Sequence, residues 1–421
     1  MRILAIYRHY WPDTTPYARI LRLILERQRE RGAEVCAYSG QPSYNGNQVG
    51  RQQWVETVGG VEIRRLAMFP EKKHWRVVRA INSLYFLLRA VAHATLRRRY
   101  DLVIANSHPP VAIGVALRLI RWLTGAQTIL HVQDIHPEGL LEIGDLDNGA
   151  IYRMALAIER ANRRGANALV TLSSDMADSL LAQGAGPDQI AIINNCPIAS
   201  SPESGDARLP DCLTDRSATR FLFAGNLGRF QHLDPLIDAA HRLGERDDWR
   251  LIFMGSGAAR LELEERAAGL IGERVFFLDQ QSPEVAAAAM ASCDYSVVSL
   301  APGVRRYAFP SKTMTCLRAG SPLAVVVEPD SDLARIVAEH QLGLVSLGHQ
   351  AEDIVEMLSE AIDRRHEFTA NERLRIARTA EQLYGTERML KEWDSLVDKI
   401  ASRALDSSAR AHTPPEHRAA A

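Results

Sequence analysis

The chain has 421 residues, of which 46% are hydrophobic and 24% are charged. This balance is typical of a globular enzyme and excludes a disordered chain, a fibrous repeat and a polytopic membrane protein. The 50 basic residues nearly match the 51 acidic ones, and the formal net charge is −1. A neutral total gives no general attraction to nucleic acid, so we expect no nucleic-acid partner.

The cysteines and the start of the chain indicate the compartment. The five cysteines are scattered and none has C-x-x-C spacing: Cys36, Cys196, Cys212, Cys293 and Cys316. This pattern favours a reducing compartment without disulfides or a cysteine zinc site. The first apolar run is too short for a signal peptide, and no uncharged apolar stretch reaches about 18 residues. We expect a cytoplasmic protein, free or held on the inner face of the cell membrane.

Short apolar runs alternate with helical periodicity in the first half, the pattern of parallel α/β proteins. The predicted strands are residues 2–6, 34–38, 61–66, 101–105, 127–133, 168–172 and 190–193. The predicted helices are residues 16–31, 76–99, 111–123, 152–164 and 174–183. Apolar residues at positions 20, 21, 24 and 25, followed by Gly32, illustrate the helical signal.

A second series follows a Ser- and Pro-rich connection. Its predicted strands are residues 221–224, 250–254, 275–278, 295–299 and 323–327. Its predicted helices are residues 233–243, 259–268, 285–290, 311–319, 351–366 and 371–402. We therefore predict an α/β protein of two doubly wound, Rossmann-like domains that face each other across a cleft. The expected divisions are a first domain 1–198, a linker 199–219, a second domain 220–370, C-terminal helices 371–403 and a disordered tail 404–421.

Residues 309–320, FPSKTMTCLRAG, are the strongest local feature. We expect Ser311 to cap a helix and Gly320 to end it. Lys312 then lies in the first turn, where a cation opposes the helix dipole by about 0.3–1 kcal/mol. An anion shared between Lys312 and the free amides would reverse that cost, whereas a solvated lysine would simply tolerate it. Both interpretations are open.

Two glycine-rich turns follow predicted strands of the second domain. Gly225, Asn226 and Gly228 precede Arg229, whose guanidinium suits phosphate oxygens, and glycines let a backbone approach a ligand. Gly255 and Gly257 form the other turn. Each alone is equally typical of an ordinary strand–loop–helix connection, but together with residues 309–312 they favour an anionic ligand.

In the first domain, residues 130–138 read LHVQDIHPE. Asp134 lies between His131 and His136, and a carboxylate beside imidazoles suits acid–base chemistry. The alternative is that Asp134 caps a helix and the histidines lie on the surface. Residues 9–13, HYWPD, either line a cleft or pack over the end of the sheet.

Residues 71–99 are strongly basic and contain a single acid, Glu71. The basic residues are Lys72, Lys73, Arg76, Arg79, Arg89, Arg97, Arg98 and Arg99, and the interleaved apolar ones are Val77, Val78, Ile81, Leu84, Leu87, Leu88 and Val91. A basic helix with an apolar stripe suits an anionic membrane surface. It is equally compatible with a domain helix whose apolar stripe faces its own sheet.

Several catalytic motifs are absent from the chain. There is no G-x-x-x-x-G-K-[ST], H-E-x-x-H or G-x-S-x-G, and no G-x-G-x-x-G follows the first predicted strand. These absences disfavour P-loop ATP hydrolysis, zinc proteolysis, serine hydrolysis and simple dinucleotide oxidoreduction.

In this order, over about residues 1–400, the segments resemble the retaining glycosyltransferases of family 4, which have the GT-B fold. The resemblance rests on residues 10–13 (YWPD), 31–35 (RGAEV), 132–138 (VQDIHPE), 224–228 (AGNLG), 255–257 (GSG) and 309–322. It is greatest for the subgroup that builds bacterial surface polysaccharides, such as colanic-acid and O-antigen sugar transferases.

The resemblance implies a metal-independent hexosyltransferase without a cofactor. The second domain would bind a UDP-sugar or GDP-sugar, the first a saccharide or lipid-linked saccharide, and the last helix would cross back to the first domain. Arg229 and Lys312 would hold the diphosphate, and Asp134 would lie near the reacting sugar. The implied donor-binding residues are Gly225, Asn226, Gly228, Gly255, Gly257, Ser311 and Thr315.

One departure from the family concerns donor hydroxyls. Many members have two glutamates eight positions apart, and here those positions are Tyr307 and Thr315. A lysine usual shortly after Gly228 is Gln231, which leaves Arg229 more of the charge.

Three other functions remain open from the sequence. A metal-dependent transferase would use Asp145 with Asp147, or Asp330 with Asp332, as D-x-D ligands. A sugar-nucleotide epimerase or hydrolase would use the same architecture. A non-catalytic partner would hold another transferase at the membrane.

Overall fold

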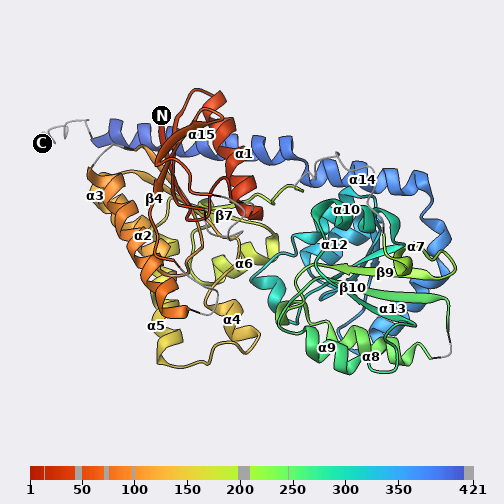
Figure 1. Cartoon of the computed structure of the whole chain (residues 1–421). Helices are drawn as coiled ribbons and strands as arrows, with labels where there is room; N and C mark the ends of the chain where they lie inside the picture. Colours follow the sequence, from red (N-terminus) through yellow and green to blue (C-terminus); the bar gives the residue numbers. More distant parts are fainter. Residues whose placement is uncertain are drawn as a thin grey trace, which may run out of the picture.

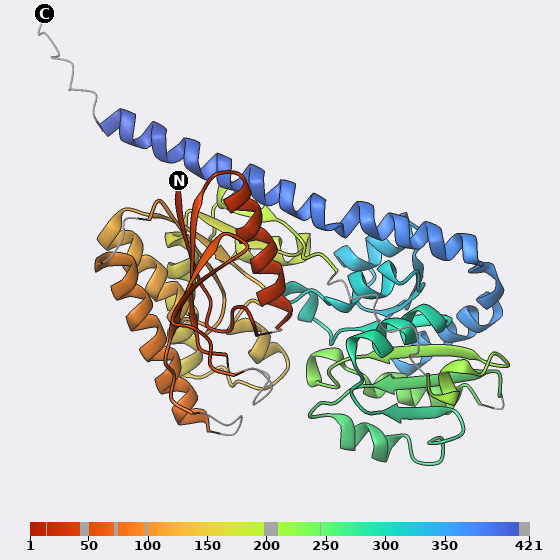
Figure 2. The same ribbon diagram turned by 45° about the horizontal axis from the view of Figure 1, so that its top comes forward.

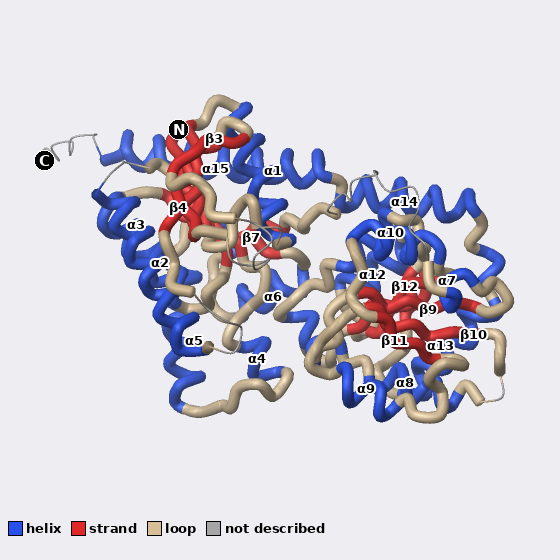
Figure 3. Tube along the Cα trace, viewed as in Figure 1, coloured by secondary structure: helices blue, strands red, loops and turns tan. Residues whose placement is uncertain are grey.

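The computed structural model describes residues 1–13, 15–42, 50–70, 75–96, 100–197, 209–244 and 246–411. Two lobes lie side by side, and the strands of each are gathered inside a layer of helices (Figures 1 and 3). The predicted α/β class with two doubly wound parallel sheets is confirmed. Among the described residues, no helix is both long enough and apolar enough to cross a membrane.

The first lobe contains an eight-stranded sheet with the order β3-β4-β2-β1-β5-β6-β7-β8. Its strands are β1 Arg2–Ile6, β2 Glu34–Gly40, β3 Val55–Val58, β4 Val61–Leu66, β5 Leu102–Asn106, β6 Gln127–His131, β7 Ala168–Thr171 and β8 Ile190–Ile192. Its helices are α1 Pro16–Glu30, α2 Arg76–Leu96, α3 Ala112–Thr124, α4 Glu138–Glu142, α5 Ala150–Gly165 and α6 Ser174–Ala182. All neighbouring strands are parallel except β3 and β4, which form an antiparallel edge.

The second lobe contains a six-stranded parallel sheet with the order β11-β10-β9-β12-β13-β14. Its strands are β9 Thr219–Ala224, β10 Trp249–Met254, β11 Val275–Leu278, β12 Tyr295–Ser299, β13 Leu323–Val326 and β14 Gly343–Val345. Its helices are α7 Asp211–Thr214, α8 Asp234–Arg242, α9 Arg260–Arg266, α10 Pro283–Ser292, α11 Lys312–Arg318, α12 Asp332–Glu339 and α13 Ala351–Asp363.

Local sequence chemistry explains how these elements begin. Helix α1 starts with Pro16 in its first turn, and the Thr15 hydroxyl accepts a hydrogen bond from the Ala18 amide at 3.2 Å. Its apolar face, which includes Ile24 and Leu25, is wholly buried against the first sheet. The helix therefore holds the carboxyl end of β1, and the loop that follows it, in a fixed position.

The C-terminal helices, α14 Ala370–Tyr384 and α15 Thr386–Ala411, connect the two lobes. Helix α14 packs against α11, and α15 packs against α1, so α15 runs along the first lobe (Figure 2). The Trp393 side chain is wholly buried in the core of the first lobe. Ion pairs Arg27–Asp394 at 3.0 Å and Arg31–Asp398 at 2.7 Å flank it.

Several boundaries differ from the sequence predictions. The predicted helix 371–402 is divided at Gly385, and the prediction of a tail from residue 404 is wrong as far as Ala411, where α15 ends. Residues 412–421 lie outside the described residues, as do residues 199–208 of the predicted linker. The rest of that linker includes the short helix α7, whose Leu213 is wholly buried.

Candidate active site

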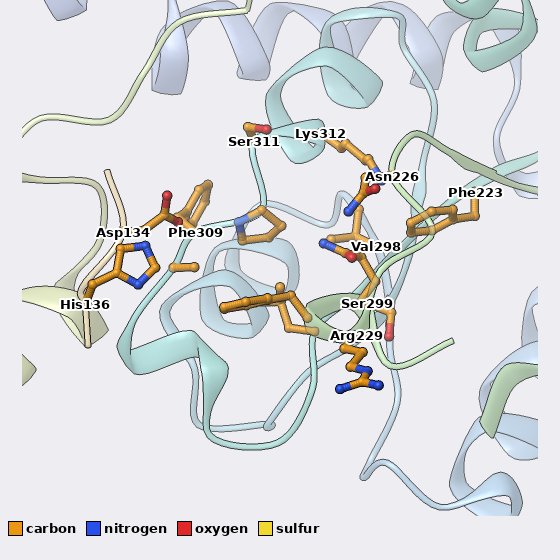
Figure 4. Close-up of a pocket in the computed structure, with 15 residues that line it drawn as sticks. Asp134, His136, Phe223, Asn226, Arg229, Val298, Ser299, Phe309, Ser311 and Lys312 are labelled. Atoms are coloured by element: carbon orange, nitrogen blue, oxygen red, sulfur yellow. The ribbon is translucent and has the colours of Figure 1, made fainter. Parts of the chain in front are cut away.

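A cavity of about 390 Å³ lies where the carboxyl ends of the two sheets meet. The first lobe contributes Asp134 and His136, which lie on one side of it (Figure 4). The second lobe contributes Asn226, Arg229 and Lys312, among others. This is the position at which doubly wound sheets bind their ligands.

The two lobes touch directly at the edge of this cavity. The Ile135 amide donates a hydrogen bond to the Tyr307 carbonyl at 2.8 Å, and Asp134 forms an isolated antiparallel bridge with Ala308. The backbone therefore fixes Asp134 against the segment that leads to Lys312.

A second cavity of about 530 Å³ lies wholly in the second lobe. The turns after β9 and β10 and helix α10 surround it, and its lining residues are Ala224, Gly225, Asn226, Met254, Gly255, Ser256, Gln280, Gln281, Ala286, Met290 and Lys312. Both cavities include Asn226 and Lys312 in their walls. These two side chains thus stand at the junction between a space inside one lobe and a space between the lobes.

The Lys312 ammonium is buried at this junction. Its Nζ lies 3.7 Å from the centroid of the Phe223 ring, and within the described residues it has no hydrogen-bond partner. Burial lowers the pKa of Lys312 from its ordinary value of 10.5 to about 8. An unpaired buried cation is costly, so the site is electrostatically prepared for an anion.

Gly225 and Gly255 are required by close packing of the protein itself. Gly225 has a φ of +137°, and a Cβ there would overlap the Lys312 side chain. Gly255 has a φ of +149°, and its Cβ would overlap the Gly225 carbonyl. The sequence interpretation assigned such glycines to a close approach of ligand. Here they let two turns and Lys312 approach one another, although both glycines also line the second cavity.

The remaining glycines of the turns do not line either cavity. A Cβ on Gly257 would overlap the Leu227 carbonyl, and the Gly228 amide donates to the Gln231 side chain at 3.2 Å. In this structure both positions shape the loop, and a contact of these two glycines with the donor stays a prediction.

Arg229 lies at the rim of the interlobe cavity. Its guanidinium donates to the Asp145 carboxylate of the first lobe at 2.8 Å, and both side chains are exposed. In Figure 4 the guanidinium points away from Lys312. The family resemblance implies that Arg229 and Lys312 hold one diphosphate, and Arg229 would have to leave Asp145 to take up that position.

The neighbourhood of Asp134 matches the sequence interpretation only in part. Asp134 is open to the cavity, yet loss of surrounding water raises the pKa of its carboxyl, while His136 opposes this shift. His131, by contrast, is buried between the rings of Tyr17 and Trp393, and burial lowers its pKa to about 3. His131 is thus a neutral core residue. The interpretation of Asp134 as a carboxylate between two active-site imidazoles is therefore wrong.

Asp134 is also not a helix cap. Helix α4 begins at Glu138, and Pro137 occupies the capping position without a side-chain hydrogen bond. The alternative reading of Asp134 from the sequence is therefore wrong as well, and the carboxyl is left facing the cavity.

Ser311 and Thr315 are placed differently from each other. Ser311 is exposed, lines the interlobe cavity and precedes α11, but its side chain makes no capping hydrogen bond, contrary to prediction. Thr315 lies one turn further along α11, half-buried, and lines neither cavity. Gly320, with a φ of +73°, ends the helix as predicted.

At least one aspartate of each D-x-D string pairs with an arginine in this structure. Asp145 pairs with Arg229, and Asp330 pairs with Arg305 at 2.8 Å. Within the part of the chain that the structure describes, no three His, Cys, Asp or Glu side chains are grouped as ligands.

Sequence reasoning missed residues that pack around the interlobe cavity. Phe223 and Phe230 form an apolar part of the wall, and Ser299 adds a polar group. Phe223 is a buried strand residue, and nothing in the sequence indicates that its ring contacts a cation. Asp145 was considered only as a metal ligand, because its pairing with Arg229 spans 84 positions.

Comparisons with known proteins identify the class and then the family. The fold is shared with sucrose-phosphate synthase from Thermosynechococcus elongatus (TM-score 0.71, 16% identity, 96% of this chain and 100% of that chain). It is also shared with Anabaena HepE in complex with UDP (TM-score 0.65, 14% identity, 95% and 100%). These are GT-B glycosyltransferases. In sequence, the chain is 25% identical over 354 residues to the putative colanic acid biosynthesis glycosyl transferase WcaI of Escherichia coli K12, covering 80% of this chain and 86% of that protein.

Two family models match consecutive parts of the chain. The glycosyl transferase 4-like domain matches residues 17–196, and glycosyl transferases group 1 matches residues 218–364. The chain therefore belongs to the GT-B glycosyltransferases of the family 4 type, as the resemblance implied.

Proposed function

We propose that this glycosyltransferase moves a hexosyl group from a nucleoside-diphosphate sugar to a saccharide or lipid-linked saccharide, with retention of configuration and without a metal. The observation that carries this proposal is the pair of cavities that meet at Lys312 and Asn226. The nucleoside would occupy the cavity inside the second lobe, and the sugar would occupy the cavity between the lobes. The diphosphate that joins them would then lie beside the unpaired ammonium.

Charge on the leaving diphosphate is the quantity that these groups stabilise. As the bond between the anomeric carbon and the phosphate oxygen breaks, negative charge grows on the diphosphate, and a preorganised cation lowers the barrier. Lys312 supplies that cation, and Arg229 adds a second after it leaves Asp145. The acceptor oxygen bonds to the same face of the anomeric carbon.

The proton of the acceptor hydroxyl goes to the departing phosphate or to Asp134. Because the pKa of the Asp134 carboxyl is raised, its carboxylate accepts a proton more readily than an ordinary aspartate would. The lobes already touch at Asp134 and Ala308, and further closure around the bound donor would exclude water and suppress hydrolysis.

The names of similar proteins support the biological setting. HepE is described in complex with UDP, and WcaI is assigned to colanic acid biosynthesis. We propose by analogy a UDP-sugar or GDP-sugar donor and a role in cell-surface polysaccharide assembly on the cytoplasmic side. The loop that carries Gln280 and Gln281 would lie beside the base.

The test begins with melting of the protein in UDP, GDP, ADP and dTDP, since a ligand of the folded state raises the melting temperature. With the stabilising nucleotide, transfer is followed in EDTA and the anomer of the product is read by NMR. Lys312→Ala should lower turnover about 100-fold or more. If no nucleotide changes the melting temperature, a non-catalytic partner is favoured. Release of free epimer or free sugar would favour an epimerase or hydrolase. Loss of activity in EDTA would favour a metal-dependent transferase.

A further inference from the structure

Helices α2, α3 and α5 present apolar side chains outward from the first lobe. Helix α3 packs between α2 and α5, and the three lie together on the outer side of the lobe (Figure 1). We call their outward surface the α2–α3–α5 face; its exposed apolar residues are Val77, Ile81, Leu84, Leu88, Val115, Leu119, Trp122, Leu123, Ile151 and Met154. Val77 is 72% exposed, Trp122 79% and Ile151 74%.

The apolar residues of α2 divide between two faces. Phe86, Leu87 and Ala90 are buried in the core of the lobe. The exposed residues from Val77 to Leu88 follow each other at intervals of four, three and four, so they form one stripe on the opposite side. The buried residues confirm the interpretation of a stripe that faces the core of the lobe, and the core does not account for the outer stripe.

The charge of the face is one-sided. Helices α2 and α3 contain no Asp or Glu, and the single acid of α5, Glu159, is buried and accepts a hydrogen bond from the Val111 amide at 2.7 Å. Exposed arginines adjoin the apolar residues: Arg79, Arg89, Arg118 and Arg153. Lys72, Lys73, Arg97, Arg98 and Arg99 lie outside the described residues.

We propose that the α2–α3–α5 face docks on an anionic lipid bilayer. Apolar side chains gain from entering the acyl boundary, and arginines gain from anionic headgroups. Trp75 and Trp122, both exposed, are suited to the interface between them. A second copy of the chain is a poor occupant, because it would bring arginine against arginine without an exposed acid on either helix set.

Docking would also place the site. Helix α2 follows β4 in the chain. The carboxyl ends of the parallel strands, including that of β4, lie on the side of the sheet that faces the interlobe cavity. An acceptor held in the bilayer by a lipid would thus be presented beside the first lobe. The docking itself does not depend on the proposed transfer reaction.

The experiment is flotation of the purified full chain with phosphatidylcholine vesicles, with or without phosphatidylglycerol. We expect binding only to the anionic vesicles, and weaker binding at high salt. Replacing one arginine, as in Arg89→Gln, should weaken binding about fivefold, and Ile81→Gln with Leu84→Gln about tenfold or more.

Matched controls come from apolar residues exposed elsewhere. Leu261→Gln on α9, where Leu261 is 75% exposed, and Leu374→Gln on α14 should leave flotation unchanged. All variants should melt like the parent and respond equally to the stabilising nucleotide, which separates docking from donor binding. No flotation with anionic vesicles, equal flotation of all variants, or a lipid-independent dimer that Leu84→Gln dissociates would overturn the proposal.

Discussion

Replacing Lys312 by methionine should make the ligand-free protein more stable. The unfolded chain holds the lysine proton with a pKa near 10.5, and the folded protein holds it with a pKa of about 8. Because the unfolded state binds the proton more tightly, folding stability is reduced at every pH below 8 and recovers as the pH rises toward 10.5. The difference corresponds to about 3 kcal/mol at pH 7.

The contact with the Phe223 ring offsets part of that cost. A cation above an aromatic face contributes about 0.5–1 kcal/mol, and methionine loses it. Methionine otherwise fills nearly the same volume without a charge. The net expectation is that Lys312→Met raises the free energy of unfolding by about 2 kcal/mol at pH 7 and by less than about 1 kcal/mol at pH 10.

Urea unfolding at the two pH values measures this directly. Lys391→Met on α15 is the control, since Lys391 is 71% exposed and its replacement should change the free energy by no more than about 0.5 kcal/mol. The ammonium is not the costly buried cation described above if Lys312→Met unfolds more readily than the parent at pH 7. The same holds if its free energy of unfolding rises equally at both pH values.

Two further substitutions test the surroundings of Lys312. Asp145→Asn frees Arg229 from an exposed ion pair worth up to about 1 kcal/mol, so nucleoside-diphosphate affinity measured by calorimetry should rise up to about fivefold; an unchanged affinity would remove Arg229 from the diphosphate site. Gly225→Ala should lower stability by about 1–3 kcal/mol and weaken the same affinity about tenfold or more, because its Cβ would displace Lys312. Gly269→Ala, at a φ of +86° with open space around it, should lower stability alone, and equal affinity in the two glycine variants would count against the displacement.

The parts of the fold that the sequence predicted are those with a strong local signal. Buried parallel strands such as β1 and β12 are continuous apolar runs between turn residues, and they were located to within a residue. Strand β3 was missed because it is an exposed antiparallel edge, and β14 because it has only three residues. Helix α12 was missed as well, although Ser331 caps it.

The candidate site was predictable as a set of loops but not as a set of contacts. Lys312, Asn226 and Asp134 do line the interlobe cavity, since each follows a strand whose carboxyl end faces it. The burial of the ammonium over Phe223, the pairing of Arg229 with Asp145 and the core position of His131 all depend on packing between distant segments. Local pattern carries no information about such contacts.

The most direct measurement is proton uptake when the stabilising nucleoside diphosphate binds. An anion beside Lys312 raises its pKa, so calorimetry at pH 8 in two buffers of different ionisation enthalpy should show about half a proton taken up, and affinity should fall about 30-fold from pH 7 to pH 9.5. Lys312→Met should show neither effect. Tight binding by both proteins, with no proton taken up and no dependence on pH, would contradict a diphosphate held by this lysine.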